Sequence, residues 1–131
     1  MLCRLYPSRT VRAATAAWAV ASALCNFYGA FQLSQGLPAL GPTATYGGGI
    51  LALVLLAALV VSARRWPVMY GLLSAIAGLL ALVTVINAFT ADPSLWLSEF
   101  WRYAGIAVNA VGVLGAALGI GGTVGRRMTM G

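Results

Sequence analysis

Residues 50–61 read ILALVLLAALVV and, after a five-residue break, residues 67–90 read PVMYGLLSAIAGLLALVTVINAFT. Neither stretch contains a charged side chain, and a bilayer core about 30 Å thick needs roughly 20 helical residues to cross it. With the preceding residues 46–49, the first stretch predicts a transmembrane helix over 46–63, and the second predicts one over 67–90. The break, SARRW, is so short that the two helices must form an antiparallel hairpin.

Two further apolar stretches, residues 13–33 and 96–121, lie on either side of this hairpin. Only helices and closed barrels satisfy their backbone groups in lipid, and long continuous apolar runs are typical of helices. The first stretch resembles a secretory signal, but it continues through Phe31, which favours an uncleaved helix. We therefore expect an all-α membrane protein, residues 1–131 forming one domain of four transmembrane helices in an up-down bundle.

The composition excludes several other classes of protein. Hydrophobic residues make up 61% of the 131 residues and charged residues 8%, with a mean hydropathy of +0.91. A soluble domain carries about a quarter charged residues, so this chain cannot cover its surface in water. The net charge of +6 comes from arginines scattered between apolar runs, which argues against a nucleic-acid partner.

The arginines predict the orientation in the membrane, because cytoplasmic loops retain positive charge. Seven of the eight fall on one predicted side, and Asp92, Glu99 and Arg102 fall on the other. The seven are Arg4, Arg9, Arg12, Arg64, Arg65, Arg126 and Arg127. Both termini are thus expected to be cytoplasmic, in a single orientation. The absence of lysine is typical of GC-rich bacterial genomes and favours the cytoplasmic (inner) membrane of a bacterium.

Small residues form two ridges at helical spacing, and such ridges let helix backbones approach closely in lipid. The first ridge comprises Ala13, Ala17, Ala21, Cys25 and Gly29, and the second includes Gly112, Gly115 and Gly119. The first interpretation is that the two ridges pack on each other within one bundle. The alternative is that they dock a second copy or a partner protein.

Three asparagines lie within three predicted spans, and an amide in lipid needs a hydrogen-bonding partner. Asn26, Asn87 and Asn109, with Tyr28 and Gln32 toward the outer side, are the candidate polar cluster. Structural hydrogen bonds between helices are the first interpretation, and a pocket or permeation path is the alternative.

The residue types predict no catalytic, cofactor or metal site. Without histidine, the usual ligands of haem, zinc and chlorophyll-type pigments are missing, and no serine has a basic partner. Cys3 and Cys25 have no CxxC spacing. Asp92 and Glu99 are expected to cap a helix and to pair with Arg102. Bound lipids are the only non-protein partners that we expect.

Aromatic residues cluster near the predicted span ends, where Trp and Tyr are enriched at the boundary between bilayer and water. We interpret Trp66 and Tyr70 as a cytoplasmic belt and Trp96, Trp101 and Tyr103 as an outer belt.

The chain has few side chains able to react and two ridges of small residues suited to helix packing. This combination favours a non-catalytic protein. We expect an accessory or scaffold subunit that packs against other membrane proteins or against itself. The alternative is a small homo-oligomeric channel or transporter for a neutral or weakly charged solute, lined by the asparagines.

Overall fold

The computed structural model describes residues 7–128, with side chains described as far as Gly122. This part of the chain is all-helical, as predicted, and has no strands. The helices are α1 (Arg9–Ser34), α2 (Tyr46–Arg65), α3 (Pro67–Thr90) and α4 (Glu99–Met128), with a short 3-10 turn, η1 (Pro93–Leu95), before α4.

Three of the four helices, α2, α3 and α4, are long and apolar enough to cross a membrane. The expected fourth span, over residues 13–33, is not shown by composition, because α1 does not reach the same apolarity. Its 26 residues are sufficient in length, at about 39 Å for a rise of 1.5 Å per residue. The difference is one of composition, since Thr15, Asn26 and Gln32 interrupt an alanine-rich helix.

Local chemistry explains where the helices begin. The side chains of Ser8 and Thr45 accept hydrogen bonds from backbone N–H groups in the first turns of α1 and α2. Pro67 opens α3, where its missing N–H leaves no bond unmade. Asp92 caps η1, and α4 begins at Glu99, later than residue 96, the start that we predicted.

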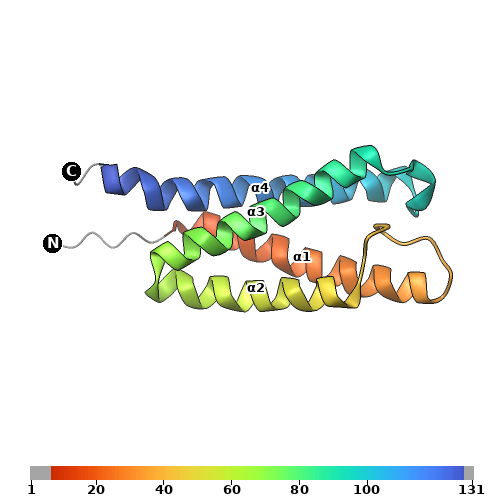
Figure 1. Cartoon of the computed structure of the whole chain (residues 1–131), viewed down its shortest axis with the longest axis horizontal. Helices are drawn as coiled ribbons and strands as arrows, with labels where there is room; N and C mark the ends of the chain where they lie inside the picture. The colour runs from red at the N-terminus through yellow and green to blue at the C-terminus, as the bar shows by residue number, and fades with distance from the viewer. Residues whose placement is uncertain (1–6, 129–131) are drawn as a thin grey trace.

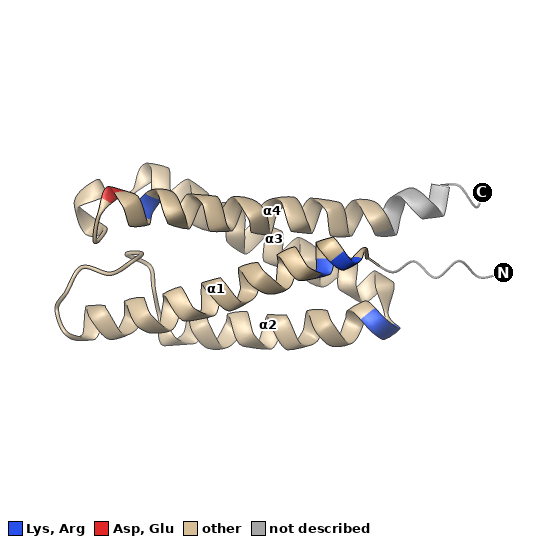
Figure 2. Ribbon diagram, turned by 180° about the vertical axis from the view of Figure 1, so that it is seen from behind, with Lys and Arg blue, Asp and Glu red and all other residues tan. Residues whose placement is uncertain are grey.

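The four helices form a bundle in which helices adjacent in sequence run in opposite directions (Figure 1). Each helix packs against two neighbours, in the order α1, α2, α3, α4 and back to α1. Figures 1 and 2 show that the α1/α2 pair and the α3/α4 pair diverge toward the end that carries the 35–45 loop. We call this the loop end.

The charged residues divide between the two ends of the bundle (Figure 2). Arg9, Arg12, Arg64 and Arg65 lie at the end opposite the loop, which we call the arginine end. The side chains of Arg126 and Arg127, in the last turn of α4, lie outside the described residues, as does Arg4. At the loop end, Arg102 forms the predicted ion pair with Glu99, with 2.8 Å between nitrogen and oxygen.

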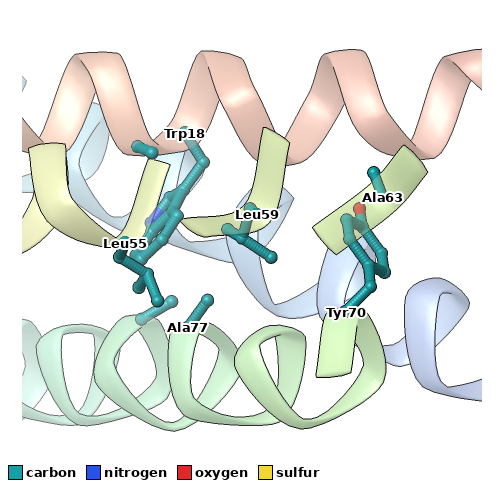
Figure 3. Packing of buried hydrophobic residues seen from close by; sticks show 8 residues of the cluster. Trp18, Leu55, Leu59, Ala63, Tyr70 and Ala77 are labelled. Carbon is teal, nitrogen blue, oxygen red and sulfur yellow. The ribbon is translucent and has the colours of Figure 1, made fainter. Parts of the chain in front are cut away.

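The hydrophobic core fills the middle of the bundle and its arginine end (Figure 3). Trp18 of α1 and Leu55, Leu59 and Ala63 of α2 pack there against α3 residues. Tyr70 belongs to this core with 1% of its surface exposed, which corrects its assignment to an exposed cytoplasmic belt. Trp66, by contrast, is 57% exposed.

The two ridges of small residues do not meet each other. Gly112 and Gly115 face α1, but they receive Trp18 and Thr15 rather than the alanine ridge, and Gly119 faces α3. A Cβ on Gly112 would lie 2.5 Å from Trp18 Cδ1, so the glycine makes room for the indole ring. On α1, Ala13, Ala17 and Cys25 are exposed, Ala21 is half-buried, and Gly29 is buried against the 39–44 loop.

Candidate functional site

A cavity of about 380 Å³ occupies the loop-end half of the bundle, between the two diverging helix pairs. All four helices and the 40–45 loop contribute to its lining. The three asparagines of the predicted polar cluster, Asn26 of α1, Asn87 of α3 and Asn109 of α4, all line it. The helices therefore bring to one cavity the three amides that the sequence placed only on separate helices.

Two of these amides are committed to holding the structure together. The Asn109 Oδ1 atom accepts a buried hydrogen bond of 3.0 Å from the Trp18 indole, and its Nδ2 donates to the Gly105 carbonyl. Asn26 accepts from the Thr45 backbone N–H and donates to the Ser22 carbonyl. Each amide joins its helix to another element, which is the behaviour expected of structural hydrogen bonds.

Asn87 differs from the other two amides. Within the part of the chain that the structure describes, no group hydrogen-bonds its side chain, although the residue is half-buried and lines the cavity. One turn earlier, the Thr84 hydroxyl donates to the Leu80 carbonyl of its own helix. The Asn87 amide thus retains its full hydrogen-bonding capacity, two donors and one acceptor, toward the cavity.

Trp96 provides a second unsatisfied polar group in the cavity wall. Its ring packs close to Gly41 and Gly105, and its backbone pairs with Ala39 of the loop in an isolated β-bridge. Only 7% of the residue is exposed, so it is a wall of the cavity rather than part of an exposed outer belt. The indole Nε1 atom is buried with no hydrogen-bond partner. A buried donor without an acceptor costs about 1–3 kcal/mol.

The rest of the lining is mainly apolar and carries no charged side chain. Leucine and valine side chains from α2, α3 and α4 contribute aliphatic surface to the wall, namely Leu51, Leu55, Leu80, Val83 and Val108. Trp18 and Leu55 belong both to this lining and to the core cluster, so the packed core closes the cavity toward the arginine end. Such a site can hold a neutral molecule by apolar contact and orient it by a few hydrogen bonds.

The other predicted polar residues lie apart from this cavity. Gln32 is buried, and its Oε1 atom accepts from the Leu40 backbone N–H, so it holds the middle of the 35–45 loop against α1. Tyr28 is exposed and does not line the cavity. Of the outer aromatics, Trp101 lines the cavity whereas Tyr103 is exposed.

The acidic residues have local structural roles at the loop end. The Asp92 carboxylate accepts a hydrogen bond of 2.9 Å from the Ser94 backbone N–H, and this bond lowers the pKa of Asp92. Among the described residues, no three of the types His, Cys, Asp and Glu come together to hold a metal ion.

Sequence reasoning missed the role of Trp96 because a tryptophan near a span end is usually an interfacial residue. The glycines Gly41 and Gly105, which accommodate its ring, belong to separate segments of the chain.

A scan against protein-family models, a search of curated proteins and a search of solved structures each find no match to this chain.

Proposed function

We propose that this protein is a four-span membrane protein that binds a small neutral molecule in the loop-end cavity, as the binding step of a carrier. The observation that carries the proposal is one uncharged cavity lined both by Asn87, whose amide has no protein partner among the described residues, and by Trp96, whose indole N–H is buried without a partner. A carrier is favoured over an open channel because the packed core closes the cavity toward the arginine end.

The contacts of α1 support its role as the fourth span. Thr15, Asn26 and Gln32, which lower its apolarity, all place their hydrogen bonds within the protein. Its exposed face carries large apolar side chains such as Leu24 and Phe31. The helix also packs between α2 and α4, two helices that can cross a membrane on their own composition. We place the protein in a bacterial cytoplasmic membrane with both termini inside, on the distribution of its arginines.

The cavity chemistry defines the class of ligand. Both unsatisfied groups can donate a hydrogen bond, so the ligand should carry carbonyl or hydroxyl oxygens as acceptors. The surrounding leucines, valines and tryptophans favour an apolar body, and burying an unpaired charge among them would be costly. A small, flat, neutral molecule with two carbonyl groups meets these requirements.

Three of the four tryptophans, Trp18, Trp96 and Trp101, line the cavity, so intrinsic fluorescence can report its occupancy. We would titrate the purified full-length chain in detergent with menadione, a neutral dione. As a matched control we would use 2-naphthoate, which has a similar bicyclic body but carries a negative charge. We expect saturable quenching by the dione and none by the carboxylate.

Variants distinguish a ligand contact from a structural hydrogen bond. Asn87→Leu should weaken binding of the dione about tenfold, the equivalent of one lost hydrogen bond, with thermal stability unchanged. Asn109→Leu should instead lower the melting temperature, because it leaves the buried Trp18 indole without its acceptor. Equal affinity of wild type and Asn87→Leu for the dione would contradict the proposed site.

A second candidate function, the accessory subunit, is favoured by the exposed small-residue face of α1. Ala13, Ala17 and Cys25 are exposed in the described chain, although Ala13 also lines the cavity at the arginine end and Cys25 the cavity at the loop end. Close packing at small residues is the usual basis of helix association in lipid. Gentle extraction followed by native mass measurement tests this candidate, and recovery of a bare monomer alone would count against it.

A further inference from the structure

We propose that the arginine end carries a binding site for one anionic phospholipid, in a second cavity between α1 and α2. This cavity has a volume of about 260 Å³ and lies away from the loop-end site. Arg9 and Arg12 of α1, Arg64 of α2 and Tyr70 of α3 contribute to its lining. The four side chains come from three helices, so the site exists only in the folded bundle.

No Asp or Glu side chain lies at this end of the bundle to balance the arginines around the cavity. The chain has two acidic residues, Asp92 and Glu99, and both lie at the loop end, where Glu99 is already paired with Arg102. Guanidinium groups bind phosphate oxygens through several N–H donors at once. Basic pockets between transmembrane helices are places where anionic headgroups bind.

Two buried polar atoms at this cavity have no partner among the described residues. The Tyr70 Oη atom is buried and unpartnered, in a residue with only 1% of its surface exposed. Figure 3 shows the Tyr70 ring rising from α3 with its hydroxyl close to Ala63, which also lines the cavity. The Arg12 Nε atom is likewise buried without a partner. Both atoms are hydrogen-bond donors, and both residues line this cavity.

The walls of the cavity favour a lipid over free phosphate. Leu56, Leu59 and Val60 of α2 line it beside the arginines, so an anionic group there would lie against aliphatic surface. Val60 is also 49% exposed on the outside of α2, which places the edge of the cavity at the surface where lipid chains run. A phospholipid whose phosphate group is bound by the arginines can therefore place its acyl chains along α2.

Native mass spectrometry of the full chain, with dioleoyl lipids added to the detergent, tests the site. We expect phosphatidylglycerol to bind at least tenfold more tightly than phosphatidylcholine with the same chains. Arg12→Gln and Arg64→Gln should each weaken phosphatidylglycerol binding about fivefold. Tyr70→Phe should weaken it by a similar factor while leaving the melting temperature of the lipid-free protein unchanged, because the hydroxyl has no protein partner to lose.

Arg65 provides the matched control, since it lies next to Arg64 at the same end but does not line the cavity. Arg65→Gln should change the affinity less than twofold. The proposal is overturned if Arg65→Gln has the same effect as Arg12→Gln, which would indicate a diffuse surface charge, or if Tyr70→Phe binds like wild type. It is also overturned if inorganic phosphate alone displaces the lipid at equimolar concentration, or if the two lipids bind equally.

Discussion

At the scale of single residues, the contact between Gly112 and Trp18 controls how α1 approaches α4. A Cβ on Gly112 would meet the indole ring, whose Nε1 atom is held by Asn109. Gly112→Ala should therefore destabilise the protein by about 1–3 kcal/mol, the usual cost of overpacking. Gly121→Ala on the same helix is the control, since nothing lies within 4 Å of its added Cβ. Thermal unfolding in detergent should show a lower melting temperature for the first variant only, and equal shifts would contradict this packing.

Residue type alone predicts that asparagines in a membrane helix need partners, but it does not say which partners they have. The Trp18–Asn109 hydrogen bond joins residues 91 positions apart, and no local pattern in the sequence records such a pair. The same limit applies to Tyr70, which looks like an interfacial residue from its place after Arg64 and Arg65. Its burial depends on how α3 crosses α2, which is a property of the packed bundle.

At the scale of elements, the segment before α4 depends on the ionisation of Asp92. The hydrogen bond from Ser94 lowers the pKa of Asp92 from its ordinary value of 3.8, so the ionised form stabilises η1. This stabilisation is fully present above pH 3.8 and is lost as the pH falls through the lowered pKa. The protection factor of the Ser94 amide, which is its exchange rate relative to an unstructured peptide at the same pH, should therefore fall in acid. Asp92→Asn, whose side chain caps at any pH, should abolish this dependence; an unchanged acid response in the variant would contradict the capping role.

Helix boundaries can be predicted from the sequence where a residue type is incompatible with continuing the helix or the apolar run. Pro67 opens α3 because it lacks an N–H, and the charged Arg64 and Arg65 end the apolar run of α2. The start of α4 is later than expected because Leu97 donates a backbone hydrogen bond to the Ala39 carbonyl. A contact between two distant loops thus takes residues 96–98 out of the helix, and no local propensity signals it.

At the scale of the whole molecule, the two ends of the bundle are chemically distinct. The arginine end holds part of the hydrophobic core and the smaller, arginine-lined cavity, and the loop end holds the larger, uncharged cavity beneath the 40–45 loop and Trp96. Composition could predict a helical membrane protein, because lipid permits few other folds for so apolar a chain. The cavity could not be predicted, because it depends on the divergence of two helix pairs (Figure 1).

The segregation of charge between these ends predicts a single orientation in the membrane. Arginines are retained on the cytoplasmic side, so Leu37 in the loop should face outward and Trp66, next to Arg65, should face the cytoplasm. Both side chains are exposed and can be replaced by cysteine in a variant whose Cys3 and Cys25 are changed to alanine. In bacterial spheroplasts expressing the protein, a membrane-impermeant maleimide should label Leu37→Cys at once and Trp66→Cys only after the membrane is opened. Partial labelling of both variants in intact spheroplasts would mean that the chain inserts in two orientations, because the arginine bias alone is then too weak to select one.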